Sequence, residues 1–226
     1  MNPILSHPIP HRRRTAAQKS NFNPLTALVY EDVWRKRSLS ILSRKPFPLQ
    51  QELDLLRSWL SECKEGVLLD VGCSTGVYAR GLASGFPAAK ITAVDMSELM
   101  VKQALKRADR EGVKVEWVVA DAISLPFEGE AFDGICMGGT LNELGPDTQV
   151  ILEECGRVLK KDGLFFMMFL LSSEKPLGRL LQRFLSLGGL RFWTTLEAES
   201  LFSRAGFEQV RFEHYGVVAF SLLRKH

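Results

Sequence analysis

The stretch Val67-Leu-Leu-Asp-Val-Gly-Cys-Ser-Thr-Gly76 decides the fold. Its first half is apolar apart from Asp70, as in a buried strand of a parallel sheet. Its second half is a turn of small residues, which let a ligand approach the backbone closely. Residues 77–84 can then form a helix whose free N–H groups face that turn. The stretch therefore predicts a strand–turn–helix unit that binds a nucleotide-type ligand, with a non-binding α/β unit as the alternative.

The glycine spacing distinguishes between classes of nucleotide. A dinucleotide site usually has the pattern G-x-G-x-x-G. The small residues here are Gly72, Ser74 and Gly76, and Val77 stands where the third glycine would be. About sixty residues also precede the strand, whereas a dinucleotide-binding fold often begins near it. The spacing therefore disfavours an NAD-linked oxidoreductase, which we keep as the less favoured alternative.

Two further apolar runs lead to an acid. Asp95 ends the run that begins at Lys90 and lies nineteen residues after the turn, where nucleotide-binding α/β folds place an acid for the ribose hydroxyls. The alternative for Asp95 is a strand end or a helix cap, although Ser97 is the better cap. The next run, Val113–Val119, leads to Asp121, which otherwise is only a turn residue. Ligands gather at the carboxyl ends of parallel strands, so we expect both acids and the turn to share one site.

The spacing Asp70-x-Gly72-x-Ser74-x-Gly76 resembles the first motif of class I S-adenosylmethionine (SAM) dependent methyltransferases, which usually have glycine where Ser74 stands. We expect the serine to be tolerated only if its dihedral angles are ordinary. Leu125-Pro-Phe127, followed by Phe132-Asp133 and an apolar strand, resembles methyltransferases of the ubiquinone and menaquinone type. The lead-in Asn23–Arg35 is similar to uncharacterised methyltransferases of cyanobacteria and plant plastids.

This resemblance implies SAM as the cofactor and S-adenosylhomocysteine (SAH) as the product. It also implies that the backbone of the turn holds the methionine part of SAM, that Asp95 holds the ribose, and that Asp70 holds the turn and touches the amino-acid end. Adenine would lie near Asp121, and Met96, directly after Asp95, would pack on the adenine face. Met137 and Gly138 would line the sulfur side. The expected cofactor-binding residues are Asp70, Gly72, Cys73, Ser74, Gly76, Asp95, Met96, Asp121, Ala122, Met137 and Gly138.

The chain ahead of this unit divides into two parts. Residues 1–23 are rich in Pro, His, Arg, Asn and Ser, so we expect a flexible basic arm, solvated rather than bound to nucleic acid. Residues 24–64 are expected to form two helices, the second over Leu49–Glu62, that cap the cofactor edge as a lid. Three side chains are candidates to close over the cofactor or the acceptor: Tyr30, Trp34 and Arg35. For Tyr30 and Trp34, which lie four residues apart, packing against each other is an equal alternative.

The fourth strand, Ala131–Met137, is followed by residues that should face the acceptor. Methyltransferases of DNA bases and glutamine amides typically carry Asn or Asp, two prolines and an aromatic residue here. Those residues are absent, which counts against amide and exocyclic-amine acceptors. Asn142 and Glu143 are expected to face the acceptor. The sequence identifies no catalytic residue. Glu143 and His214 are candidates for a general base. The favoured alternative for Glu143 is a polar residue at a helix start, and for His214 it is a structural or exposed role.

The remaining elements complete an α/β fold over residues 65–226. We expect a helix from Pro146 to about Lys160, a strand at Leu164–Leu171, and a helix from the Thr194–Glu197 capping box to Gly206. Two alternating runs at 208–215 and 217–223 indicate a hairpin. The predicted fold is a Rossmann-like, seven-stranded, mostly parallel sheet with a C-terminal antiparallel hairpin.

Residues 172–193 form an insertion between the fifth strand and the last helix, and the resemblance places it over the acceptor site. Its leucines recur at helical spacing with arginines on other faces, which indicates an amphipathic helix. Phe184 is a candidate acceptor contact. The segment 177–191 is also a candidate for peripheral membrane contact, with an ordinary helix packed on the domain as the alternative.

The composition of the chain limits the classes of protein and partner to consider. The chain has 226 residues, of which 46% are hydrophobic and 24% charged, and a net charge of +3. These values are ordinary for a soluble globular protein and too mild to indicate a nucleic-acid partner, so no DNA is expected. The four cysteines have no metal-ligand spacing, so no metal site is expected, and no apolar run is long enough to span a bilayer. We expect a cytoplasmic protein.

These observations favour one function. We predict methyl transfer from SAM to a small, apolar acceptor such as a quinone, lipid, pigment or other secondary metabolite, on oxygen or carbon, by in-line displacement. The main alternative is a SAM- or SAH-binding regulatory module without turnover, which Ser74 and the lack of a convincing base permit.

Overall fold

The computed structural model describes residues 4–9, 15, 18–19, 22 and 47–226. The first helix of the expected lid, with Tyr30, Trp34 and Arg35, lies outside the described residues. The predictions made for these three side chains therefore stay predictions.

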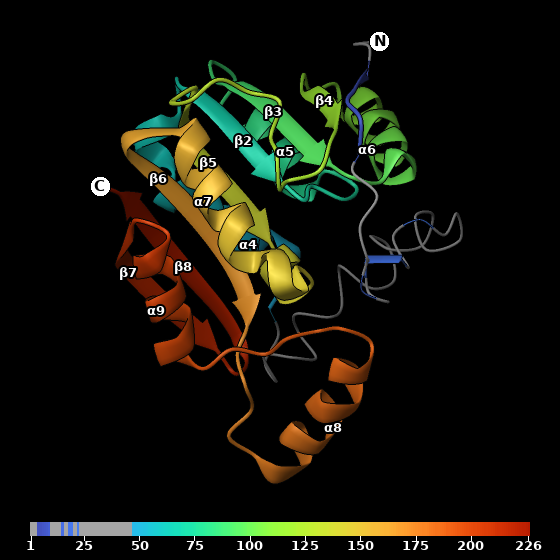
Figure 1. Ribbon diagram of the computed structural model, residues 1–226. Coiled ribbons are helices and arrows are strands. Elements are labelled where there is room, and N and C mark those ends of the chain that lie inside the picture. Colours follow the sequence, from blue (N-terminus) through green and yellow to red (C-terminus); the bar gives the residue numbers. More distant parts are fainter. Residues whose placement is uncertain (1–3, 10–14, 16–17, 20–21, 23–46) are drawn as a thin grey trace.

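An eight-stranded sheet forms the centre of the protein (Figure 1). The strand order is β1-β4-β3-β2-β5-β6-β8-β7, and all neighbours are parallel except β8, which is antiparallel to both β6 and β7. The mostly parallel sheet with a C-terminal hairpin is confirmed. The strands are β1 (Leu5–Ser6), β2 (Val67–Val71), β3 (Lys90–Asp95), β4 (Glu116–Val119), β5 (Phe132–Gly138), β6 (Leu159–Leu170), β7 (Phe207–Tyr215) and β8 (Val218–Lys225).

The eighth strand comes from the N-terminal arm. Leu5 and Ser6 pair in parallel with Val118 and Val119 of β4, and the N–H of His7 donates to the carbonyl of Val119 at 2.9 Å. Without this pairing β4 would be an edge strand with unpaired backbone groups. Composition predicts a flexible arm for residues 1–23, but backbone pairing does not depend on side-chain composition, so these two residues extend the sheet.

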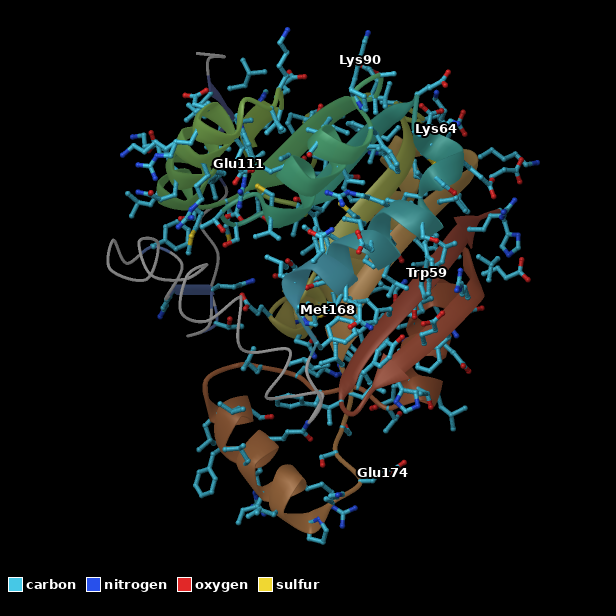
Figure 2. All side chains as sticks on the ribbon, turned by 180° about the vertical axis from the view of Figure 1, so that it is seen from behind. Trp59, Lys64, Lys90, Glu111, Met168 and Glu174 are labelled. Atoms are coloured by element: carbon cyan, nitrogen blue, oxygen red, sulfur yellow. The ribbon has the colours of Figure 1, made fainter. Side chains whose placement is uncertain are left out.

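Two helical layers cover the sheet (Figures 1 and 2). Helices α4, α5 and α6 contribute to one apolar core and helices α7 and α9 to the other. Strand residues alternate between the two cores: Leu68 faces the first and Leu69 the second. The helices are α4 (Leu49–Trp59), α5 (Val77–Gly85), α6 (Glu98–Glu111), α7 (Thr148–Val158), α8 (Pro176–Leu187) and α9 (Thr195–Arg204), with short 3-10 turns η2 (Ser61–Cys63), η3 (Thr140–Asn142) and η4 (Gly145–Asp147).

Helix α4, which the sequence predicts as part of a lid, lies beside α5 in the first helical layer (Figure 2). Leu56 and Trp59 are buried in the core. The Nε of Arg57 donates to the carbonyl of Gly81 at 3.0 Å, which ties α4 to α5. Glu52, at the start of α4, accepts a hydrogen bond from the hydroxyl of Tyr78. The helix is therefore a supporting layer for the strand–turn–helix unit.

The predicted helix ends are largely confirmed. The hydroxyl of Ser97 accepts from the N–H of Met100 at the start of α6, and Gly112 ends that helix with a φ of 69°. The capping box of α9 is present, because Thr194 and Glu197 bond to each other's backbone N–H groups. The residues that form each of these helix ends lie within about four positions of one another, so local side-chain chemistry determines where the helices begin and end.

The boundary between α7 and β6 differs from the prediction. The helix ends at Val158, and β6 begins at Leu159 rather than Leu164. Leu159 is fully buried and pairs with Phe132, while Lys160 donates to the carboxylate of Asp133 at 2.7 Å. Burial and pairing with β5 thus extend the strand through residues whose composition indicates a turn.

Among the residues that the structure describes, we find no helix with the length and apolar character required to cross a bilayer.

Candidate active site

The turn between β2 and α5 has three left-handed residues at alternating positions. The φ angles are 69° at Gly72, 50° at Ser74 and 78° at Gly76. The N–H groups of Gly72 and Cys73 both donate to the carbonyl of Val94, at 2.9 and 3.0 Å. The turn is therefore fastened to the end of β3, which fixes its backbone at the carboxyl edge of the sheet.

Both glycines of the turn are in close contact with neighbouring side chains. A Cβ added to Gly76 would lie 2.4 Å from the ring of Trp117, and one added to Gly72 would lie 2.4 Å from the hydroxyl of Thr140. These positions require glycine for space as well as for positive φ. Trp117 in β4 and Thr140 in η3 thus shape the turn, and the sequence gives no local signal for either contact.

Ser74 contradicts one expectation. We expected a serine to be tolerated only with ordinary dihedral angles, but its φ is 50°. A left-handed non-glycine residue costs roughly 1–2 kcal/mol. Two contacts hold the conformation: the N–H of Ser74 donates to Oδ2 of Asp95 at 2.8 Å, and its hydroxyl contacts Sδ of Met100 at 3.6 Å. The serine therefore follows the same left-handed path that glycine would take.

Asp95 organises the loops at two strand ends. Its carboxylate accepts from the N–H of Ser74 and, through Oδ1, from the N–H of Ser97 at 2.8 Å. The side chain is 9% exposed. Burial raises the pKa of Asp95, and the two backbone hydrogen bonds offset part of that rise. A carboxylate has about four acceptor positions, so two remain for ligand hydroxyls.

Asp70 lies beneath the turn and starts the following helix. Its Oδ2 accepts from the N–H of Ala79 in the first turn of α5 at 3.0 Å, one of the groups that lacks a partner within the helix. The residue is 2% exposed but contributes to the lining of the pocket. This geometry agrees with the expected role in holding the turn.

A small pocket opens at this turn. Its lining combines β2, the turn, the start of α5 and the end of β5. The helix N-terminus points its free N–H groups at the pocket, where they favour an anionic group such as a carboxylate. The lining residues are Asp70, Gly72, Cys73, Ser74, Thr75, Val77, Tyr78 and Gly138.

Tyr78 is a site residue that the sequence analysis missed. Its ring packs against Gly138, where an added Cβ would lie 2.8 Å away, and its hydroxyl donates to Glu52. The ring thus forms one wall between the turn and β5. The relevant signal is nonlocal, because the partners lie 60 residues downstream and 26 upstream.

Cys73 is not a reactive thiol. It is 5% exposed, and burial, followed by the nearby charges of Asp95 and Asp70, raises its pKa well above the usual value. The thiol therefore stays protonated at neutral pH. Its contribution to the pocket comes from the backbone and from its small size.

The residues expected near adenine lie at the neighbouring strand ends. Met96 is half-buried directly after β3. Asp121 follows β4, is buried, and accepts through Oδ1 from the N–H of Ile123 at 3.3 Å; Ala122 beside it is half-buried. Because β3 is parallel to β2 and β4 is parallel to β3, these residues lie along the same edge of the sheet as the pocket.

Two side chains on α7 hold the loop that follows Asp121. The carboxylate of Glu154 accepts from the N–H of Leu125 at 2.7 Å and from two guanidinium nitrogens of Arg157 at 2.8 Å. Arg157 also donates to the carbonyls of Leu125 and Phe127, at 3.1 and 2.9 Å. The pair Glu154 and Arg157, which we call the Glu154–Arg157 clamp, fixes the backbone of the loop on the predicted adenine side.

We expect Glu154→Gln to destabilise the fold by roughly 1–2 kcal/mol, because it removes a charged acceptor from three hydrogen bonds. The bonds from Arg157 lower the pKa of Glu154 below 4.5. A lowered folded-state pKa means that the stabilisation is present above pH 4.5 and is lost as the pH falls through the folded value. Denaturant unfolding between pH 3 and 7 measures this. Glu153→Gln, next to it and exposed, is the control; equal pH profiles for both variants would contradict the prediction.

Two expected site residues have structural roles instead. The side chain of Met137 is fully buried in the core on the α7 side of the sheet, so it cannot line the sulfur side. Asn142 is 1% exposed; its amide exchanges hydrogen bonds with the backbone of Leu170 at 2.8 and 3.0 Å and donates to the carbonyl of Arg191. Asn142 therefore joins η3 to the two ends of the insertion, and its amide is used within the fold.

The other candidates are dispersed. Glu143 is half-buried just after η3, close in the chain to Thr140, which contacts the turn. His214 is exposed on β7, the third strand from β5 in the sheet, so it does not join the pocket. Phe184 is 63% exposed on α8 and is not part of the pocket lining. Of the candidate bases, only Glu143 lies near the turn.

Comparison with known families identifies the unit built around this turn. The model of a family described as a methyltransferase domain matches residues 68–163, from β2 to the start of β6. Residues 68–163 are a methyltransferase domain. This match confirms the predicted methyltransferase class for these residues. The matched span contains the turn, both acids and the Glu154–Arg157 clamp.

Two relatives extend the match beyond the motif. A demethylmenaquinone methyltransferase of Staphylococcus aureus is 38% identical over 110 residues, which are 48% of this chain and 43% of that protein. An uncharacterised chloroplastic methyltransferase of Arabidopsis thaliana is 29% identical over 149 residues, 63% of this chain and 41% of that protein. The chain thus aligns with less than half the length of either relative.

The methyltransferase domain also has the expected architecture among solved structures. The crystal structure of a SAM-dependent methyltransferase from Aquifex aeolicus superposes with a TM-score of 0.68, covering 91% of this chain and 100% of that one, at 22% identity. At this identity the likeness shows the fold. The Rossmann-like arrangement predicted from the sequence is confirmed.

Proposed function

We propose that this protein transfers the methyl group of SAM to a small, apolar acceptor by in-line displacement, on oxygen or carbon. The observation that carries the proposal is the turn of the methyltransferase domain: three left-handed residues, two of them glycines in close contact, beside a helix N-terminus and the buried carboxylate of Asp95. The site residues fit a ligand with an amino-acid end and a ribose.

The fit follows from the chemistry of the lining. The N-terminus of α5 suits the carboxylate of the methionine part, and Asp70 lies beside it as a counter-charge for the amino group. The remaining acceptor positions of Asp95 suit the ribose hydroxyls. Gly72, Gly76 and Gly138 let the side chains that shape the pocket pack directly against its backbone. SAM supplies an electrophilic methyl group on a sulfonium.

The protein contributes orientation and exclusion of water. The turn is fastened to β3 through Val94 and Asp95, so the cofactor pocket has a preformed shape. Methyl transfer in line with the acceptor needs accurate placement of both reactants, which converts a bimolecular step into an effectively unimolecular one. Glu143 is the candidate base for an acceptor that must lose a proton, because it follows η3 directly.

Two observations favour an apolar acceptor. One relative is named a demethylmenaquinone methyltransferase, and the segment after β5 lacks the Asn-Pro-Pro-aromatic pattern of enzymes that methylate planar nitrogen groups. A quinone, lipid, pigment or other secondary metabolite therefore suits this protein best.

A binding screen followed by a transfer assay tests the proposal. We expect SAM and SAH to raise the thermal unfolding temperature, and NAD and NADP to leave it unchanged. Labelled methyl from SAM should then appear in a quinone, lipid or pigment fraction. Stabilisation by NAD instead of SAM would contradict the proposal in favour of an oxidoreductase. SAM binding without transfer to any fraction would favour the regulatory module.

A further inference from the structure

Helix α8 turns its apolar stripe away from the protein. Among the described residues, eleven large apolar side chains are exposed, and six of them belong to this one helix. The most exposed are Leu187 at 83% and Leu177 at 76%. Figure 1 shows α8 beyond the carboxyl end of β6, apart from both helical layers. The exposed stripe consists of Leu177, Leu180, Leu181, Phe184, Leu185 and Leu187.

The opposite, polar side of α8 holds the helix to the domain. Gln182 accepts from the N–H of Ser173 at 2.8 Å and donates to the carbonyl of Leu171 at 2.9 Å. Gly178, one turn earlier, is so close to Ser173 that an added Cβ would lie 2.1 Å from its hydroxyl. An ordinary surface helix buries its apolar stripe and exposes its polar side. In α8 the apolar stripe is exposed instead, and Gln182 and Gly178 lie against residues 171–173.

Basic residues border the apolar stripe. Arg179 and Arg183 lie one helical turn apart and are exposed. In the part of the chain that the structure describes, neither guanidinium is in an ion pair or a hydrogen bond. Lys175 precedes the helix, and Glu174 is the one acid between residues 172 and 191. The surface around the stripe is therefore positively charged.

We infer that α8 docks this protein onto the surface of a lipid bilayer that contains anionic headgroups. A helix with an apolar stripe bordered by arginines lies in the plane of the interface, with the stripe among the acyl chains and the charges at the headgroups. With 12 residues, α8 is about 18 Å long, which suits lying in the interface and is too short for crossing. Anionic headgroups complement Arg179 and Arg183.

A second copy of the chain is a less suitable occupant. Stable protein interfaces use about 20–30 residues on each side, whereas the exposed stripe of α8 consists of six residues. A bilayer needs no complementary shape and accepts a single short helix.

Docking would place the cofactor pocket close to the membrane. Strand β6, which leads to α8, is parallel to β5 and β2, so α8 and the pocket lie at the same edge of the sheet. An apolar acceptor dissolved in the bilayer would then have a short path to the site. Docking itself does not depend on methyl transfer, so the two proposals can fail independently.

Sedimentation of the full chain with phosphatidylcholine vesicles, with and without phosphatidylglycerol, tests the inference. We expect binding to the anionic vesicles that weakens as salt is added. Leu177→Glu combined with Leu187→Glu should weaken this binding at least about tenfold, because the two carboxylates would replace apolar side chains that lie among the acyl chains. Leu196→Glu, at a position that is 75% exposed on α9, is the matched control and should bind like the wild type. The thermal shift with SAM shows that each variant is folded.

The charged border is tested separately. Removing two basic residues with Arg179→Gln and Arg183→Gln should weaken binding to anionic vesicles roughly 30-fold, whereas Lys106→Gln with Arg110→Gln, an exposed pair with the same spacing on α6, should change it little. The inference is overturned if the wild type binds neither vesicle, if the α8 variants match their controls, or if light scattering shows a dimer that the Leu177/Leu187 variant dissociates.

Discussion

Replacing Gly76 by alanine should weaken SAM binding by about 100-fold or more and destabilise the domain, because the added methyl has no space. Its Cβ would lie 2.4 Å from Cη2 of Trp117 and 3.1 Å from Cβ of Ala104. Trp117 is fully buried between α6 and the sheet, so its ring cannot move aside. The turn must shift instead, and its N–H groups then no longer point at the cofactor. Calorimetric titration with SAM measures the loss.

Gly112→Ala is the matched control for that experiment. Gly112 ends α6 with a φ of 69°, close to the 78° of Gly76, and an added Cβ would meet nothing within 4 Å. Both variants therefore carry similar backbone strain, roughly 1–2 kcal/mol, and only Gly76→Ala has the clash. We expect Gly112→Ala to lose stability and keep its affinity for SAM. Equal SAM affinities in the two variants would refute the close-packing argument.

A second substitution separates steric conflict from misfolding. The atoms that Gly76→Ala would hit, Cη2 and Cζ3, belong to the six-membered ring of Trp117, which phenylalanine at that position would leave open. Trp117→Phe alone should cost stability through the cavity it creates. Combined with Gly76→Ala, it should restore part of the lost SAM affinity. Additive losses in the double variant would contradict the contact.

The sequence predicts this fold well wherever the deciding interactions are local. Apolar runs mark the strands, and the caps of α6 at Ser97 and Gly112 depend on side chains within one helical turn. The glycine spacing of the turn and the acid at Asp95 likewise predict the cofactor edge, because strand ends in a parallel sheet must meet there.

Other features depend on partners distant in the sequence. The left-handed conformation of Ser74 is held by Asp95 and Met100, which the chain brings back only after a further strand and helix. Asn142 has the composition of a site residue, but the backbone of Leu170 and Arg191 occupies its amide. Such uses of a side chain become visible only when three segments are placed together.

The insertion shows a third reason why the sequence does not predict every feature of the structure. Periodicity predicts the amphipathic helix α8, but periodicity cannot tell which side of a helix meets the protein. That depends on Gln182 and Gly178, whose contacts with residues 171–173 leave the apolar stripe facing outward. The alternative of an ordinary packed helix is therefore wrong in its orientation, although its length and position follow the pattern.

Replacing Asp95 by alanine should also weaken SAM binding about 100-fold, for two reasons that can be measured apart. One is indirect, because the N–H groups of Ser74 and Ser97 lose their acceptor and the turn loosens. The other is direct, through the ribose hydroxyls. A thermodynamic cycle with SAH and its 2′- and 3′-deoxy analogues isolates the direct part, because removing the carboxylate and the hydroxyl that contacts it should not be additive. Unchanged SAM affinity in Asp95→Ala, or additive losses in the cycle, would refute the ribose assignment.

The pH dependence of Asp95 gives an independent check, because binding and folding should respond with opposite signs. Burial raises the pKa of this carboxyl above 3.8 in the free protein, so its protonation favours the folded state as the pH falls through the folded value. Protonation also removes acceptor positions from the ribose, so SAM affinity should fall over the same interval. Asp95→Asn, which has no proton to take up there, should lack both contributions. Calorimetric SAM titrations and denaturant unfolding of wild type and Asp95→Asn at matched pH values measure the two differences. A wild-type affinity that parallels the variant from neutral pH down to acid unfolding would show that the ionised carboxylate does not hold the ligand.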